Sequence, residues 1–331
     1  MAKRMARMAV RQLIRMLLLI FCASLAAFVL LSLSPIDPLQ QNVGQAAMGS
    51  MSAEQIERLQ AYWGVDTPPL ERFAAWVGGM LRGDFGVSLL YRQPVLTVIG
   101  AKMANSLWLL VLAWVISGLL GFGLGVLAGA TQGRWPDKLI RGWSMIIAST
   151  PAFWVALLLL MIFGVWLKLL PVGLSVPIGL EATAVTLADR LLHAILPALA
   201  LSITGTASVC LHTRQKTIQA LESDFVLFAR ARGESGKGIL LRHVLRHVLL
   251  PAITLQFASL GELLGSSVLV EEVFSYPGLG QATVTAGLGG DLPLLLGITV
   301  ICSAMVFGAN FAADCLYGLV DPRIRKGAGR T

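Results

Sequence analysis

Six long apolar runs constrain this chain more than any other feature. A helix that spans a bilayer needs about 20 consecutive, mostly apolar residues. Of the 331 residues, 56% are hydrophobic and 13% are charged, against about 25% charged in an ordinary soluble protein. We therefore predict an all-α polytopic membrane protein with six transmembrane helices, at Leu13–Leu33, Leu107–Ala128, Ile146–Leu169, Leu191–Leu211, Ala252–Val270 and Leu294–Leu319.

The fourth run is the weakest of the six. It contains a proline, a glycine and several hydroxyl side chains, namely Pro197, Ser202, Thr204, Gly205, Thr206 and Ser208. Small and hydroxyl-bearing residues are typical of contacts between membrane helices. We expect this helix to be buried among other helices rather than to face lipid.

Charge predicts the orientation, because short cytoplasmic loops carry an excess of Lys and Arg. Nineteen of the 26 basic residues fall on one predicted side: five in residues 3–15, three in 134–141, seven in 214–246 and four after Asp321. Both termini are therefore expected in the cytoplasm. This arrangement accounts for the net charge of +8 without a nucleic-acid partner.

Residues 1–33 also have the basic start and apolar core of a secretory signal. We reject that interpretation because the run has 21 residues, against about 7–15 in a signal peptide, and no cleavage pattern precedes Pro35. The chain's cysteines show no spacing typical of a disulfide or metal framework, so no metal site is predicted at Cys22, Cys210, Cys302 and Cys315.

The runs divide the chain into a cytoplasmic segment with the first span, an extracytoplasmic insertion, a five-helix core and a cytoplasmic tail, at residues 1–34, 35–104, 105–320 and 321–331. Within the insertion, Ser52 and Gln55 match a capping box for a helix that runs to about Tyr62. An amphipathic helix is expected at Leu70–Leu81.

A polar, basic segment at residues 214–250 interrupts the core. Its first helix, Phe225–Arg232, should stop at Gly233, which can adopt the positive φ that ends a helix. A second helix follows, with one apolar and one basic face: Leu240, Leu241, Val244, Leu245 and Val248 against Arg242, His243, Arg246 and His247.

Two interpretations of this segment remain open from its pattern alone. Either a partner protein on the aqueous side binds it, or Arg242 and Arg246 hold an amphipathic helix on anionic lipid. His243 and His247 have the spacing of a metal pair, but a solvated face is the simpler interpretation because no third ligand lies near them in the sequence.

Specific motifs extend over the whole chain. Asp224-Phe225-Val226 precedes Ala229-Arg230-Ala231-Arg232-Gly233, and Pro251 follows the glycine by eighteen residues. Further motifs occur at Tyr62–Asp66, Gly83–Ser88, Ser149–Trp154, Val270–Gly280 and Asp321–Arg325. Together they resemble the membrane permease subunits of the dipeptide, oligopeptide and nickel class of ATP-binding-cassette (ABC) importers. Tyr276 stands where that class more often has tryptophan.

The resemblance implies a six-helix permease like those of type I importers, in a bacterial inner membrane, forming half of a translocation path. It assigns ATPase coupling to Asp224, Ala229, Arg230, Ala231, Arg232 and Gly233. It also implies three kinds of partner: a second homologous permease, one or two ABC ATPase subunits, and an extracytoplasmic substrate-binding protein.

Enzymatic activity is not expected in this chain. The phosphate-binding pattern G-x-x-x-x-G-K-[ST] does not occur, and the nearest piece, Gly233–Gly238, has the wrong spacing and lacks the hydroxyl that binds magnesium. ATP and Mg²⁺ should therefore bind to the partner ATPase, and no cofactor or catalytic residue is expected here.

Glu262 lies near the middle of the fifth predicted span, where a charged side chain costs roughly 2.5–3.5 kcal/mol. Gly261 and Gly265 accompany it in a pattern that favours close helix approach. We predict that Glu262 lines the substrate path and contacts a cationic cargo. The alternative is a structural glutamate at the contact with the second permease.

Three acids, Glu271, Glu272 and Asp291, bracket the last outer loop, where we expect them either to dock the binding protein or simply to be solvated. Gly123 and Gly125 match a loose dinucleotide pattern but lie inside an apolar span, so we interpret them as a helix-packing face.

Among other classes, an ion-gradient-driven secondary transporter or channel is the alternative, supported by Glu262 and the Thr150-Pro151 break. This alternative assigns no function to the polar, basic segment at residues 214–250. A membrane enzyme is disfavoured because no histidine pairs with a nucleophile within the spans. The cargo remains open between short peptides and nickel or its chelates, with a small tilt towards metal chelates from residues 261–265.

Overall fold

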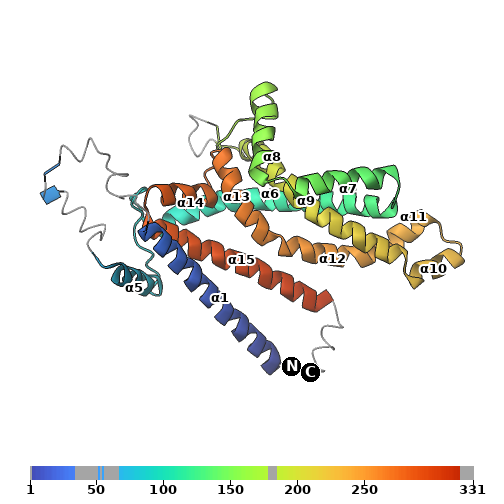
Figure 1. Ribbon diagram of the computed structural model, residues 1–331, viewed down its shortest axis with the longest axis horizontal. Helices are drawn as coiled ribbons and strands as arrows, with labels where there is room; N and C mark the ends of the chain where they lie inside the picture. The colour runs from blue at the N-terminus through green and yellow to red at the C-terminus, as the bar shows by residue number, and fades with distance from the viewer. Residues whose placement is uncertain (1, 34–50, 53, 56–66, 178–184, 321–331) are drawn as a thin grey trace. The chain divides into compact units, whose positions relative to one another are not determined.

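The computed structural model describes the chain except at residues 1, 34–50, 53, 56–66, 178–184 and 321–331. The described residues are almost entirely helical, as predicted (Figure 1). The described residues form two compact units, one within residues 1–106 and 277–307 and the other within residues 107–276 and 308–320. Residues 214–250, the predicted coupling segment, and Glu262 both belong to the second unit.

Five helical stretches in the described chain are long and apolar enough to cross a membrane, and a sharply bent helix pair makes a sixth. The five are α1 (Ala2–Ser32), α6 (Val95–Ala130), α9 (Leu187–Leu221), the stretch Gly236–Ala258 and α15 (Leu292–Val320). Four of the six predicted runs therefore correspond to single helices. The other two are interrupted.

The third predicted run, Ile146–Leu169, is divided by a bend of 105°. It falls on three successive helices, α7 (Trp135–Ala148), α8 (Ala152–Leu159) and the π-helix η1 (Leu160–Trp166). Pro151 has no N–H and disfavours helical conformation at Thr150, so α7 cannot continue through it. The Ser149 and Thr150 hydroxyls donate to carbonyls one turn earlier, at 3.1 and 2.8 Å. The break falls at the Thr150-Pro151 pair noted in the sequence, and the bent pair still counts as one candidate span.

The fifth predicted run, Ala252–Val270, is also interrupted. Ser259 separates α12 (Leu245–Ala258) from α13 (Leu260–Val273), and its hydroxyl donates to the Gln256 carbonyl at 2.8 Å. Such local hydrogen bonds compete with the helix ladder. On the other side, the helical stretch continues back to Gly236. The predicted end of the polar segment at residue 250 is therefore not a helix boundary.

Helix α9 lies at the centre of the second unit and packs against α7, α8, α12 and α13 (Figure 1). Its apolar window is 61% buried, the largest share among the five candidate spans. A capping box between Thr186 and Asp189 begins the helix. The prediction that this proline- and hydroxyl-rich helix is buried is confirmed.

In the first unit, α5 (Pro69–Met80) confirms the helix expected at residues 70–81. Its Phe73 packs against Phe28 of α1, with ring centroids 5.0 Å apart. Ser52 and Gln55 make the two hydrogen bonds of the predicted capping box, at 2.9 and 3.3 Å. The rest of that helix, to about Tyr62, lies outside the described residues.

A row of glycines at i, i+4 spacing on α6 lets α9 approach closely. A Cβ on any of the three would lie 2.7 Å or less from an α9 side chain: Gly121 from Val209, Gly125 from Thr213 and Gly129 from Thr217. A Cβ on Gly123 would meet nothing within 4 Å. The predicted packing face therefore exists, but it follows the i, i+4 row and omits Gly123.

This difference gives a matched pair of variants. Gly125→Ala should destabilise the protein by about 1–3 kcal/mol, because the added methyl overpacks the contact between α6 and α9. Gly123→Ala adds the same methyl to the same helix in open space and should not destabilise it. Thermal unfolding of the detergent-solubilised protein measures both, and equal losses would contradict the close contact.

Candidate functional site

Residues 214–250, the predicted coupling segment, begin within α9, and their first separate helix is α10 (Asp224–Ala231), which ends as predicted. Gly233 has φ +80°, a conformation that glycine adopts without steric cost. The amide of Gly233 donates to the Arg230 carbonyl at 2.9 Å, and that of Glu234 to the Ala229 carbonyl at 3.1 Å. The chain then turns into α11 (Gly236–Ile239), so that α10 and α11 form a compact tip of the unit (Figure 1).

An apolar cluster ties this tip to the span that follows it. Val226 and Ala229 of α10 are buried against Ile239, Val244 and Val248. Ala229 is therefore a packing residue. The other predicted coupling residues are exposed: Asp224, Arg230, Ala231, Arg232 and Gly233.

Two exposed residues of α10 were not among the predicted coupling residues. Leu227 and Phe228 are 67% and 72% exposed on α10. The sequence could have predicted this exposure. Two apolar residues directly after Val226 cannot share its buried face on a helix of 3.6 residues per turn. They give α10 an outward apolar surface flanked by Arg230.

The second helix of the segment departs from its predicted faces. It begins with a π-helical turn, η2 (Leu240–Val244), which offsets the 3.6-residue period, and Leu241 is exposed rather than buried. His243 Nε2 lies 3.0 Å from Glu234 Oε2, and the His247 ring lies 4.6 Å from that of Phe225. Each histidine therefore contacts a different neighbour.

A cavity of about 250 Å³ lies where both helix breaks meet α9. Glu262, in the first turn of α13, contributes a carboxylate to its lining. The other polar lining residues are all hydroxyls: Thr150, Thr204, Ser208, Ser259 and Ser266. The structure thus brings Glu262 together with residues from three helical segments that the sequence did not group.

Of the two glycines near Glu262, Gly265 has no close helix neighbour that the structure shows. A Cβ at Gly265 would meet nothing within 4 Å among the described residues. Close approach at Gly261 and Gly265 by a helix of the second permease therefore stays a prediction.

Two of the three acids predicted to dock a binding protein are buried, which corrects that prediction. Asp291 begins α15, where its carboxylate accepts hydrogen bonds from Ser88 Oγ at 2.5 Å and from the amides of Leu90 and Leu294, each at 3.1 Å. Glu271 is fully buried. Of the three, only Glu272 is exposed.

The buried Glu271 also affects a neighbouring phenol. Burial, and secondarily the charge of Glu271, raise the pKa of Tyr276 to about 12. Tyr276 therefore stays neutral at physiological pH. Its side chain is buried in the apolar core of the second unit.

Comparison with known proteins decides the family. Residues 121–326 match the family described as the binding-protein-dependent transport system inner membrane component. The chain belongs to this permease family. Family membership supports an ABC permease subunit and not the ion-gradient-driven alternative.

The curated relatives align with nearly the whole chain. The chain is 31% identical to the oligopeptide transport system permease protein AppB of Bacillus subtilis, over 97% of this chain and 99% of the relative. It is also 31% identical to the glutathione transport system permease protein GsiC of Escherichia coli, over 96% and 98%. A putative peptide permease protein of Brucella ovis is 31% identical over 93% and 95%. The chain is thus a multi-pass inner-membrane permease of the peptide and oligopeptide class of ABC importers.

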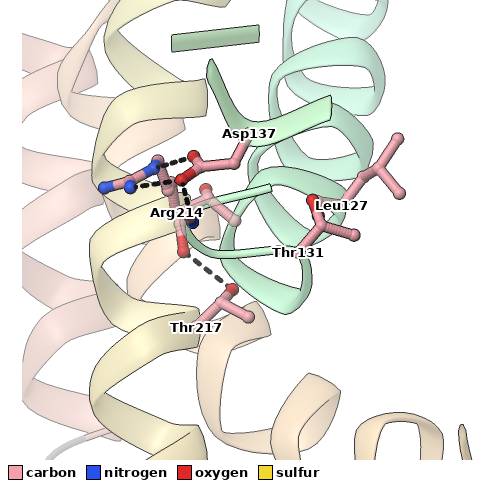
Figure 2. A network of polar contacts seen from close by, with 7 residues as sticks. Leu127, Thr131, Asp137, Arg214 and Thr217 are labelled. Atoms are coloured by element: carbon pink, nitrogen blue, oxygen red, sulfur yellow. Dashed lines mark hydrogen bonds and ion pairs between the residues drawn. The ribbon is translucent and has the colours of Figure 1, made fainter. Parts of the chain in front are cut away.

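A buried ion pair fixes the start of α7 in this permease. Figure 2 shows Arg214 of α9 directed at the Asp137 carboxylate, with Nε–Oδ1 and Nη2–Oδ2 distances of 2.5 and 2.8 Å. The Gly133 amide donates to the same carboxylate at 2.8 Å. Asp137 is the one acid between Asp84 and Glu181 in the sequence, a signal that could have marked it.

The pair should behave as one unit in mutagenesis. The two side chains are only 3% and 15% exposed, so Asp137→Asn or Arg214→Gln leaves a poorly solvated charge and should destabilise the permease by up to about 3–5 kcal/mol. The double variant should lose less than the sum of the single losses. Melting temperatures of all four forms test this, and additive losses would contradict the coupling.

Proposed function

We propose that this permease imports short peptides as one half of a path formed with a second, homologous permease. The relatives compared above carry the names of oligopeptide, glutathione and peptide permeases. These names are stronger support for a peptide cargo than the sequence of residues 261–265 is for a metal chelate. Nickel species remain the alternative cargo for the test.

Separate subunits supply energy and delivery in this proposal. One or two ABC ATPases bind ATP and Mg²⁺, so the permease itself needs no catalytic residue or cofactor. An extracytoplasmic binding protein delivers the peptide to the outer loops, where Glu272 is the exposed acid available for docking. The bias of basic residues supports the placement of both termini and of the 214–250 segment in the cytoplasm.

The exposed face of α10 is the observation that carries the ATP-driven mechanism. Leu227 and Phe228 offer an apolar surface at the tip of the unit, which suits insertion into a groove of another protein. Burial of Val226 and Ala229 against Val244 and Val248 makes α10 move with the helix that leads into α12. Closure of the ATPase pair would thereby tilt α12 as a lever in a rigid-body transition.

A substitution at the tip tests the coupling role. Gly233→Leu should abolish peptide-stimulated ATP hydrolysis by the assembled complex, because it strains the positive φ and adds bulk beside the α10 face. Gly133→Leu is the matched control: Gly133 has φ +76°, and a Cβ there would also meet nothing within 4 Å. Normal stimulation in Gly233→Leu, or equal loss in both variants, would contradict the assignment.

The cargo is tested by ATPase activity of the purified complex in nanodiscs with its binding protein. We expect a dipeptide mixture to stimulate hydrolysis above the basal rate, because peptide delivery should favour the closed ATPase pair. Stimulation by nickel or nickel–histidine instead would replace the peptide assignment with metal-chelate import.

A further inference from the structure

We propose that the cavity around Glu262 binds the positively charged amino group of the imported peptide. This inference rests on the proposed function, because it names the part of the cargo that this half of the path recognises. The argument depends on the charge of the cavity, on the direction of its hydrogen bonds and on its place in the fold.

The cavity is built for a positive charge. Within the described residues that line it, Glu262 is the one charged side chain, and no Lys or Arg contributes. Its carboxylate forms no hydrogen bond or ion pair with any other described residue, and the side chain is exposed to the cavity. An ammonium group would complete a charge-assisted hydrogen bond with it, the stronger kind of hydrogen bond in proteins.

The hydroxyls favour a hydrogen-bond donor as ligand. Thr150 Oγ1 donates to the Ile146 carbonyl at 2.8 Å, and Ser259 Oγ to that of Gln256 at 2.8 Å. Thr204 Oγ1 donates to the Leu201 carbonyl at 3.0 Å. Since each hydroxyl carries one proton, these three offer the cavity only lone pairs. A ligand with several N–H donors, such as an ammonium, fits these three oxygens beside Glu262, whereas a carboxylate placed there would meet their lone pairs and the Glu262 carboxylate.

Glu262 also lies at an interruption of the helix. It belongs to the first turn of α13, directly after the break at Ser259. Interrupted helices also mark the substrate sites of other membrane transporters, because they expose polar groups inside the membrane. Here two interruptions, at residues 149–151 and at Ser259, meet at one cavity.

The size of the cavity limits what it can hold. Sites for whole drug-sized ligands occupy about 300–1,000 Å³. At about 250 Å³ the cavity suits one end of a short peptide rather than the whole molecule. Recognition of the amino group, which peptides share, leaves the variable side chains to the rest of the path.

Uptake of trialanine by proteoliposomes that hold the complete transporter and its binding protein tests the role of the charge. Glu262→Gln keeps the side-chain volume and should raise the half-saturating concentration by about tenfold to a hundredfold, because a charge-assisted hydrogen bond is lost. Glu262→Asp should recover much of this loss. Glu71→Gln removes the same charge from the exposed surface of α5 and should leave uptake unchanged.

The outcomes separate the inference from the proposed function. Unchanged half-saturation in Glu262→Gln overturns the cavity's role while peptide import stands. A fall in the maximal rate alone, with no recovery in Glu262→Asp, assigns Glu262 to structure and also overturns it. Absence of uptake by the unmodified transporter contradicts peptide import itself, and the cavity is then judged by the following measurement.

Thiol labelling measures the cavity without transport. In a complex whose permease has its four native cysteines replaced, Ser208→Cys places a thiol in the lining. A trimethylammonium thiosulfonate should label it at least tenfold faster than a sulfonate analogue, and Glu262→Gln should remove this preference. Trialanine should slow the labelling, whereas N-acetyl-trialanine should not. Equal rates for both reagents, or equal protection by both peptides, would overturn the inference.

Discussion

The hydrocarbon core of a bilayer offers no hydrogen-bond partner to a free backbone N–H or C=O, so every interruption of a helix must be satisfied within the protein. Hydroxyl side chains bond exposed carbonyls at both interruptions of the second unit. Thr150 and Ser259 each donate to a carbonyl of the helix that ends there. The same hydroxyls then present only lone pairs to the cavity between them. The chemistry of the cavity is thus a consequence of how the helix breaks are stabilised.

The breaks can be tolerated because α9 provides a continuous support. Its small and hydroxyl-bearing residues let the glycine row of α6 pack at backbone distance, and Arg214 holds the first turn of α7 through Asp137. A buried ion pair contributes more to a defined geometry than to net stability, since desolvation offsets most of its attraction. The ion pair fixes the start of α7. The direction of α8 relative to α7 is therefore set at the bend at residues 149–151.

Much of this arrangement was predictable because its signals are local. Four spans, the burial of α9 and the end of α10 at Gly233 follow from apolar length, hydroxyl content and glycine conformation in the sequence. The burial of Asp291 was not predictable, since its partner Ser88 lies 203 residues away in the chain. Leu241 was misplaced because one π-helical turn offsets the 3.6-residue period. Pro151 predicts the first break from the local sequence, whereas the single serine at the second break, Ser259, does not.

A ligand shifts a conformational equilibrium only through different affinities for the two states. The cavity meets this condition by its position. Glu262 belongs to α13, and the break at Ser259 separates it from α12. Val248 of α12 and Val244 of η2, directly before it, pack against α10. A tilt of α12 therefore changes the geometry between Ser259, Glu262 and the hydroxyls of α9. In the proposed mechanism, an ammonium that contacts all three in one state would lose part of these contacts in the other, so cargo affinity would change at the joint between α12 and α13.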